Sequence, residues 1–491
     1  MSDETIALEE GQRLSRSRLW DWQRRYFMSQ GAAAWQSGTV PHYVTSNTFM
    51  ADAYAQTVLG FLRDSAAQID RGQPVYLIEL GAGIGRFGFH FLVCFFERLA
   101  QSPLAGLAVT YVLSDLAPAN VDFYLSHPQL RPYFDAGRLD CAVFDATRDS
   151  ELALRKSGVT LSPAGLRNPL VILANYFFDG VPADAFSLVE DRLYEELVSL
   201  RVLGPIADRD DPALLQHVEL DHASRPAALP YYGDAQWDRI LDVYAQRGGK
   251  GRFLFPCAAL ACLARLRALL DPNRGTAPSF LLLSADKGAH ALSDVLGQGA
   301  SLTVHGSFSL LVNYHAIAEW VRGLGGLSLH TDHRQGSLSL NAFVLPAQLG
   351  DGAAVETRRA FADAIACGGP DDLFLVKKAL DYRYETLTVE QALALIRITA
   401  YDAKIFCGCI PVLREALLRN AASSPLSADI LSALALVRAR FFSIGEADEL
   451  GADLADFFAS LDQAGSAYAQ PAVRGHRFAT LRILPAPLIQ R

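Results

Sequence analysis

The chain has 491 residues, of which 51% are hydrophobic and 20% charged, and its formal net charge is −9. This length predicts about two to four globular domains, and the acidic balance disfavours nucleic acid or an anionic membrane as a partner. The apolar runs are shorter than the roughly 20 residues of a membrane-spanning helix. The N-terminus lacks the apolar core of a signal peptide, and the seven scattered cysteines predict free thiols in a cytoplasmic protein.

The first 40 residues are predicted to form a helical arm. Five aromatic residues lie between Trp20 and Trp35, with Arg24 and Arg25 among them. Such an amphipathic helix packs on the next domain or covers a site as a lid. Thr48–Arg63 follows as a helix with apolar residues at helical spacing.

The stretch Val75–Arg86 has the sequence VYLIELGAGIGR. Its apolar residues predict a buried strand, and its alternating glycines predict a tight turn before a helix at Phe87–Leu99. A buried strand, a glycine-rich turn and a helix are typical of a site for an adenosine-containing cofactor. Five residues of this stretch are expected to contact the cofactor: Glu79, Gly81, Ala82, Gly83 and Gly85.

The acid before the glycine turn distinguishes two cofactors. In a pyrophosphate site, the Glu79 carboxylate would face negative charge, which costs Coulomb energy. S-adenosylmethionine instead presents a sulfonium and an amino group, which an acid suits. Glu79 therefore favours S-adenosylmethionine, although the spacing Gly83-x-Gly85-x-x-Gly88 leaves a nicotinamide dinucleotide open.

Further apolar runs alternate with helical segments and predict a doubly wound, Rossmann-like α/β sheet. Runs of this kind mark parallel strands that are covered on both faces. The strands are expected at Val109–Ser114, Leu139–Phe144, Leu170–Leu173 and Phe280–Leu283, with Leu338–Leu345 as the final edge strand.

Polar residues follow three of these strands. Asp115 comes about 30 residues after the glycines, where an acid accepts both ribose hydroxyls. Asp145 is placed to meet the adenine amino group or, alternatively, to cap a turn. The cofactor contacts expected here are Asp115, Leu116, Asp145, Ala146 and Asn175.

The segment Ala174–Pro182, ANYFFDGVP, follows the fourth strand and faces the same sheet edge. Aromatic walls with a carboxylate suit a cationic or amine methyl acceptor. Asp179 is therefore a candidate catalytic residue. The alternative is that Phe177 and Phe178 belong to the core and Asp179 caps a turn.

The second half of the chain predicts other structures. Phe186–Val189 and Leu193–Leu200 form a strand pair, and residues 203–255 hold an irregular insertion or cap. Strand patterns end near residue 350, so 349–491 is expected to be an all-α domain that binds a partner or packs as structure. The isolated Cys407-Gly408-Cys409 motif has no second pair, so no metal site is predicted.

Three motifs, VYLIELGAGIGR, YVLSD and VILANYFFDGVP, resemble the MidA-like family of class I S-adenosylmethionine-dependent methyltransferases. That family includes the mitochondrial complex I assembly factor that methylates a protein arginine. Weaker matches, among them Tyr194–Val198 and Leu281–Gly288, extend the resemblance over about residues 40–345. The methyltransferase domain is accordingly expected at 41–348, between the arm at 1–40 and the helical region.

The resemblance implies S-adenosylmethionine as cofactor and a nitrogen acceptor on a protein or peptide. It adds Glu196 and Tyr176 to Asp179 on the acceptor side of the site. Tyr176 stands where the family has a glutamate, which puts arginine as the acceptor in doubt. Two other functions stay open: a methyltransferase-like scaffold protein with weak activity, and a nicotinamide-dependent oxidoreductase.

Overall fold

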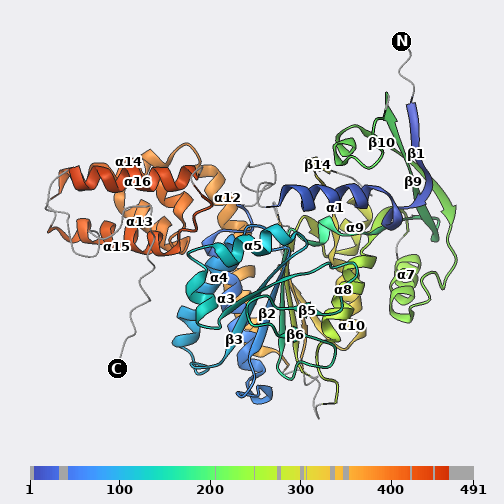
Figure 1. The fold of residues 1–491 in the computed structure, drawn as a ribbon, viewed down its shortest axis with the longest axis horizontal. Coiled ribbons are helices and arrows are strands. Elements are labelled where there is room, and N and C mark those ends of the chain that lie inside the picture. The colour runs from blue at the N-terminus through green and yellow to red at the C-terminus, as the bar shows by residue number, and fades with distance from the viewer. Residues whose placement is uncertain are drawn as a thin grey trace.

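The computed structural model describes most of the chain and contains two large sheets and a helical C-terminal region (Figure 1). The described residues are 5–31, 43–204, 206–247, 249–273, 278–298, 303–305, 307–331, 338–346, 353–420, 423–445 and 448–463. Within these ranges, none of the helices combines the length and the apolar character that crossing a membrane requires.

The central sheet has seven strands in the order β17-β18-β12-β7-β2-β3-β4. From β12 to β4 the strands are parallel, whereas β18 runs antiparallel to β12 and to β17. The strands are β2 (Val75–Leu80), β3 (Val109–Asp115), β4 (Leu139–Val143), β7 (Leu170–Asn175), β12 (Phe280–Asp286), β17 (Leu327–His330) and β18 (Ser339–Leu345). The predicted fold class, a mostly parallel α/β sheet with a helical C-terminal region, is confirmed.

One detail of the sheet prediction is wrong. Leu338–Leu345 was expected at the edge, but β17 occupies that place and β18 lies between β17 and β12. The sequence LSLH of β17 is short, half-buried and partly polar, so it lacks the continuous apolar run that identifies the inner strands.

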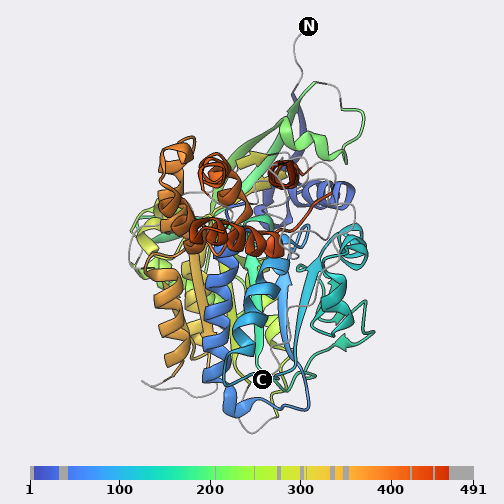
Figure 2. The same ribbon diagram turned by 90° about the vertical axis from the view of Figure 1, so that its left-hand side faces the viewer.

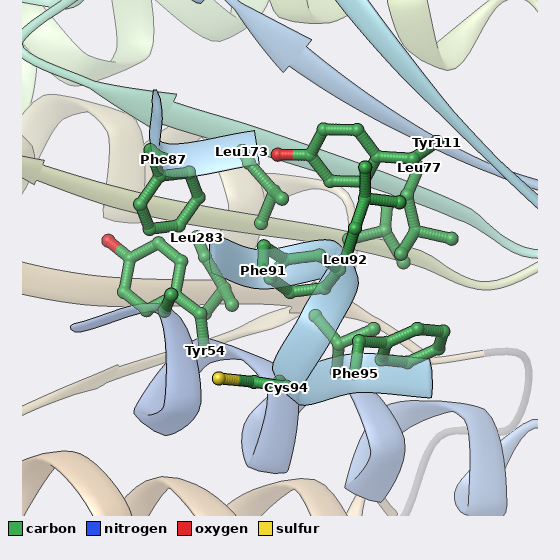
Figure 3. Packing of buried hydrophobic residues seen from close by; sticks show 14 of the residues in the cluster. Tyr54, Leu77, Phe87, Phe91, Leu92, Cys94, Phe95, Tyr111, Leu173 and Leu283 are labelled. Atoms are coloured by element: carbon green, nitrogen blue, oxygen red, sulfur yellow. The ribbon is translucent and has the colours of Figure 1, made fainter. Parts of the chain in front are cut away.

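Helices cover both faces of the central sheet. On one face lie α3 (Thr48–Asp64) and α4 (Arg86–Ala100), and on the other lie α8 (Cys257–Arg267) and α10 (Tyr314–Gly323). Side chains alternate along β2, so that Leu77 joins the first core and Ile78 the second. Aromatic rings of α4 fill the space between α3 and the sheet (Figure 3), with the Tyr54 and Phe87 centroids 5.4 Å apart.

A second sheet has five strands, with β1-β9-β8-β11 in order and β10 paired to β9. The strands are β1 (Thr5–Arg13), β8 (Asp184–Val189), β9 (Arg192–Leu203), β10 (Val218–Pro226) and β11 (Gly251–Phe255). The predicted pairing of the segments that form β8 and β9 is confirmed, and it is antiparallel. In Figure 1 the end of this sheet formed by β1, β9 and β10 lies on the opposite side from the C-terminal helices.

Two predictions for these regions are wrong. Among the described residues of the arm, 5–31, the α-helix is α1 (Leu19–Gln30), whereas Thr5–Arg13 pairs with β9 because tertiary pairing overrides a weak local preference. The insertion is not irregular, since it holds β10, α7 (Ala235–Arg247) and β11. The exposed, polar β10 lacks the alternating pattern of a half-buried strand. Residues 32–42 of the arm and the segment after it, with Trp35, lie outside the described residues.

The described C-terminal helices lie within 349–491, the region that the sequence predicts to be all-α. They are α11 (Val355–Phe361), continued by a π-helix (Ala362–Ala366), α12 (Pro370–Leu380), α13 (Val389–Ile398), α14 (Ala403–Arg419), α15 (Pro425–Arg440) and α16 (Glu449–Gln463). Helix α11 packs on α3, where Asp64 accepts hydrogen bonds from the Glu356 and Thr357 N–H groups at 3.1 and 2.7 Å. Figure 2 shows the molecule from the side on which α3 and α4 cover the sheet. Helices α13–α16 share a separate hydrophobic core.

The remaining α-helices and strands of the described residues are short. They are α5 (Pro118–Ser126), α6 (Arg131–Asp135), α9 (Leu292–Gln298), β5 (Leu152–Ala153), β6 (Thr160–Leu161), β13 (Gly288–Ala289), β14 (Thr303–His305), β15 (Ser307–Ser309) and β16 (Val312–Asn313). Two of these elements lie near the candidate site: α5 follows β3, and β15 lies beside α1.

Candidate active site

A cavity of about 450 Å³ lies at the carboxyl edge of the central sheet. Gly81 follows β2, Tyr176 follows β7, and both line it. The strand order reverses between β2 and β7, because β3 and β4 continue to one side and β12 to the other. Open α/β sheets bind ligands at such a switch point. The volume falls within the roughly 300–1,000 Å³ of small-molecule sites.

The cavity brings together seven of the thirteen site residues predicted from the sequence. Those that line it are Gly81, Asp115, Leu116, Asp145, Ala146, Tyr176 and Asp179. Ala82, Gly83 and Gly85 shape the turn behind Gly81. Glu79, Asn175 and Glu196 do not line the cavity and have other partners.

Asp115 holds the glycine turn in place. Its Oδ2 accepts the Gly83 N–H at 3.0 Å, and its Oδ1 accepts the Ala117 N–H at 2.9 Å. Burial raises the pKa of Asp115 to about 6, and these N–H donors oppose that rise. The same carboxyl group therefore fixes the turn and faces the cavity.

The three glycines of the turn are left-handed, and three of its N–H groups are occupied. Gly81, Gly83 and Gly85 have φ of 64°, 58° and 76°, which side chains rarely allow. The N–H groups of Ala82 and Gly85 donate to the Ser114 and Ala82 carbonyls at 2.9 and 2.8 Å, and that of Gly83 donates to Asp115. A phosphate cradle needs free N–H groups, so these three amides do not provide one.

Glu79, which the sequence predicts to contact the cofactor, does not line the cavity. Side chains alternate along β2, so Glu79 shares the face of Leu77 and lies beneath α4. Its carboxyl group accepts a hydrogen bond from the Tyr111 hydroxyl at 2.8 Å. Burial raises the pKa of Glu79 to about 8 and nearby Asp115 adds to the rise, while the Tyr111 hydrogen bond opposes it.

The raised pKa of Glu79 predicts a pH-dependent stability. The folded protein keeps a proton that the unfolded chain releases above its ordinary pKa of 4.5. The contribution of Glu79 is therefore fully present below that pKa and is lost as the pH rises towards about 8. We compare the free energy of unfolding of Glu79→Gln and of the wild type by urea denaturation at about pH 6 and about pH 8. From the lower to the higher pH, the variant should become more stable relative to the wild type by roughly 2 kcal/mol. A difference between the two proteins that does not change with pH would contradict this prediction.

Helix α1 covers the cavity, as the lid interpretation of the arm predicts. Trp20, Gln23, Arg24 and Phe27 line it from this side. The Gln23 amide joins two walls, because its Nε2 donates to the Gly180 carbonyl at 3.2 Å and its Oε1 accepts the Phe308 N–H at 2.9 Å.

Asp145 interacts with a residue of the N-terminal arm. It forms an ion pair with Arg24 of α1 and accepts the Thr147 N–H at 3.0 Å. Burial works against ionisation, but the hydrogen bonds from Thr147 and Arg24 hold the pKa of Asp145 below its ordinary value. Arg24 is a site residue that sequence reasoning did not assign, although it lies among the aromatic residues of the arm.

Another wall of the cavity is formed by the segment after β7. Tyr176 has φ 46°, a left-handed conformation that is unusual for a residue with a side chain. The Phe177 ring lies against Gly81, where an added Cβ would be 2.8 Å from Phe177 Cδ2. Asp179 is buried and faces the cavity beside Phe308, whose ring centroid is 4.8 Å from that of Trp20. This wall therefore combines aromatic rings with a carboxyl group.

Sequence reasoning does not identify Asp286 as a site residue. It ends β12, and its Oδ2 accepts the Asp179 N–H at 3.1 Å. Lys287, the next residue, lines the cavity. The sequence pattern that could have identified Asp286 is an acid at the end of a buried strand, which is the pattern that identifies Asp115.

The structure does not bring Glu196 or Asn175 to the cavity. Glu196 is buried in β9 of the second sheet, where it accepts the Ser187 and Ser224 hydroxyls at 2.5 and 2.6 Å. Asn175 Oδ1 accepts the Tyr54 hydroxyl at 2.8 Å. Both side chains are satisfied by neighbouring polar groups, which a local sequence pattern does not reveal.

No protein-family model and no curated protein matches the chain. Among solved structures, it is similar to a Burkholderia thailandensis protein bound to S-adenosyl-homocysteine, at 15% identity and a TM-score of 0.40, over 70% of this chain and 96% of that one. A second structure of a B. thailandensis protein has 14% identity and a TM-score of 0.39, over 69% of this chain and 95% of that one. The chain is also similar to magnesium protoporphyrin IX methyltransferase from Synechocystis with bound S-adenosyl-homocysteine. The identity is 11% and the TM-score 0.29, over 66% of this chain and 99% of that one.

Proposed function

We propose that the chain is a class I methyltransferase that uses S-adenosylmethionine to methylate a nitrogen, on a protein or peptide. One observation carries the proposal: the glycine turn with Asp115 and the aromatic wall with Asp179 line the same cavity. The first wall suits an adenosine-containing cofactor and the second suits an acceptor. The protein or peptide nature of the acceptor rests on the resemblance of the sequence motifs.

The residues of the first wall fit S-adenosylmethionine. The bare backbone of Gly81 leaves space that a side chain would fill, because Phe177 lies against it. Asp115 offers a carboxylate to ribose hydroxyls, and Asp145 and Ala146 lie where the adenine is expected. When bound, S-adenosylmethionine supplies a methyl carbon to which the acceptor nitrogen bonds as the carbon–sulfur bond breaks and its electron pair stays on sulfur.

The chain contributes orientation, dehydration and proton transfer. Trp20, Phe177 and Phe308 give the acceptor side apolar surfaces that displace water. Asp179 is the carboxyl group placed to orient the nitrogen and take its proton. Positioning of this kind supplies much of the rate enhancement in a displacement reaction.

The occupied turn amides disfavour the oxidoreductase alternative. A dinucleotide would place its pyrophosphate against the N–H groups of this turn. Those of Ala82, Gly83 and Gly85 already donate to protein oxygens. S-adenosylmethionine has no phosphate and does not need them.

Parallel calorimetric titrations of the full chain test the proposal. S-adenosylmethionine and S-adenosyl-homocysteine should bind, and NADH should not. Binding of NADH without S-adenosylmethionine would support the oxidoreductase instead. Cofactor binding with no formation of S-adenosyl-homocysteine across a panel of peptide acceptors would favour the scaffold alternative.

A further inference from the structure

The N-terminal arm places a cation at the end of the cavity where the adenine is expected. Arg24 of α1 lines the cavity and forms an ion pair with Asp145, the acid that follows β4. The ends of β3 and β4 are joined there, because the Phe144 N–H donates to the Asp115 carbonyl at 2.9 Å. Phe144 and Leu116 give this end of the cavity apolar surface. Arg24 therefore lies at the same sheet edge as the acid assigned to the ribose hydroxyls.

The acceptor sites of the Asp145 carboxylate are already used within the protein. Its Oδ1 accepts the Thr147 N–H at 3.0 Å and the Thr147 hydroxyl at 2.6 Å. Its Oδ2 accepts a hydrogen bond from Arg24 Nη1 and forms an ion pair with Arg148 Nε at 3.6 Å. A carboxylate has about four lone-pair sites. An adenine amino group would therefore have to displace one of these donors before it could bind Asp145.

Further hydrogen bonds hold the loop that carries Asp145. The Asp145 N–H donates to Asp149 Oδ2 at 2.7 Å, which closes the loop on itself. From α8, Arg265 Nε donates to the Asp149 carbonyl at 3.0 Å, and Arg265 Nη2 donates to the Ala146 carbonyl. These bonds fix the backbone of the loop, so the carboxylate has a defined position from which it orients Arg24.

The cost of breaking the ion pair decides which group meets the base. The bond from Arg24 to Asp145 joins two opposite charges, whereas the adenine amino group is a neutral donor. The Asp145 side chain is only 11% exposed, and removing one partner from such a pair is costly. The Arg24 side chain is 34% exposed, and a guanidinium has five N–H donors, of which this pair uses those of Nη1. Arg24 can therefore donate to a ligand while it stays paired.

We propose that Arg24 donates a hydrogen bond to a ring nitrogen of the adenine, and that Asp145 is a positioning residue that holds the guanidinium there without binding the amino group. This inference rests on the proposed function and concerns how that site recognises its cofactor. The ring nitrogens of adenine are acceptors, which suit a guanidinium that stays protonated. The cofactor site is then complete only when α1 lies over the cavity.

Calorimetric titration of the full chain with base analogues of S-adenosyl-homocysteine tests the assignment. S-inosyl-homocysteine carries a carbonyl acceptor in place of the amino group, which suits a guanidinium and opposes a carboxylate. The wild type should bind it within about threefold of S-adenosyl-homocysteine. Among the 1-deaza, 3-deaza and 7-deaza analogues, the one that lacks the acceptor for Arg24 should bind about tenfold more weakly.

Arg24→Met removes the donors and keeps an unbranched side chain. This variant should bind S-adenosyl-homocysteine about tenfold more weakly than the wild type does, and it should bind the sensitive deaza analogue equally well, because both changes remove the same hydrogen bond. Movement of the arm alone would weaken all the ligands equally and leave the deaza discrimination intact. Asp145→Asn loses the ion pair, so it should reduce the deaza discrimination while the ratio of inosyl to adenosyl affinity stays unchanged.

Arg25→Met is the matched control. Arg25 is the next residue of α1, its Nη2 pairs with Asp210 at 3.3 Å, and it does not line the cavity. The control removes the same charge from the same helix and should bind every ligand as the wild type does.

Four results would overturn the assignment and leave the proposed function standing. They are wild-type binding of S-inosyl-homocysteine more than about tenfold weaker than that of S-adenosyl-homocysteine, equal binding of all three deaza analogues, deaza discrimination that persists in Arg24→Met, and its loss in Arg148→Met instead. Failure of the wild type to bind S-adenosyl-homocysteine and every analogue would overturn both proposals.

Discussion

Gly81→Val is expected to abolish S-adenosylmethionine binding, with an increase in Kd of about 100-fold or more. Gly81 has φ 64°, and a Cβ there would lie 2.8 Å from Phe177 Cδ2. The valine methyl groups would therefore displace the Phe177 ring or fill the part of the cavity that the bare backbone leaves open. The left-handed conformation adds a cost of about 1–3 kcal/mol. Calorimetric titration of the purified variant with S-adenosylmethionine measures the effect.

Gly106→Val separates the effect on the site from the effect on the backbone. Gly106 has φ 80°, is exposed, and has no atom within 4 Å of an added Cβ. The control thus carries the same backbone strain far from Phe177, and it should lose stability but keep wild-type affinity for the cofactor. Equal losses of affinity in both variants would show that Gly81 acts through the fold and not through the cavity.

Asp115→Ala is expected to weaken S-adenosylmethionine binding by about 100-fold. The substitution removes the carboxylate that faces the cavity and leaves the Gly83 and Ala117 N–H groups without their acceptor. Hydrogen bonds to a charged group contribute about 1.5–3 kcal/mol each, and about 1.4 kcal/mol is tenfold in affinity. Wild-type binding should also weaken below about pH 6, where Asp115 becomes protonated, and the variant should lose that pH dependence.

Asp122→Ala is the control for Asp115→Ala. Asp122 is an exposed acid of α5, seven residues further along the chain, and it does not line the cavity. Its removal changes the net charge equally and should leave the affinity for S-adenosylmethionine unchanged. Wild-type affinity in Asp115→Ala, measured in the same titration series, would exclude the assigned role of Asp115.

The parts of the site that the sequence predicts follow from strand ends. Asp115 and Asp145 come directly after buried apolar runs, and the carboxyl ends of parallel strands share one edge, so their meeting at a cavity could be foreseen. Glu79 shows the limit of this reasoning. It also ends an apolar run, but the two-residue alternation along β2 turns it towards α4. The alternation with Leu77 was visible in the sequence.

Long-range pairing explains the other errors. Whether Glu196 joins the cavity depends on which sheet contains β9, and no local pattern encodes that choice. The strand at Thr5–Arg13 exists because β9 pairs with it from almost 190 residues away. Asp286 becomes a site residue only when β12 lies beside β7. Such contacts come from packing of the whole chain.

The docking of the arm also sets an order of events during synthesis. Strand β1 needs β9 as its partner, and Gln23 bonds to Phe308, 285 residues further along the chain. A growing chain cannot complete the α1 wall until the ribosome has released residue 308, at about 5–20 residues per second. Trp20 and Trp22, both buried in the folded protein, stay without their native packing for that time. The arm is thus made before the sheet that it packs against but takes its final place after it, and the cavity closes only after most of the sheet has been made.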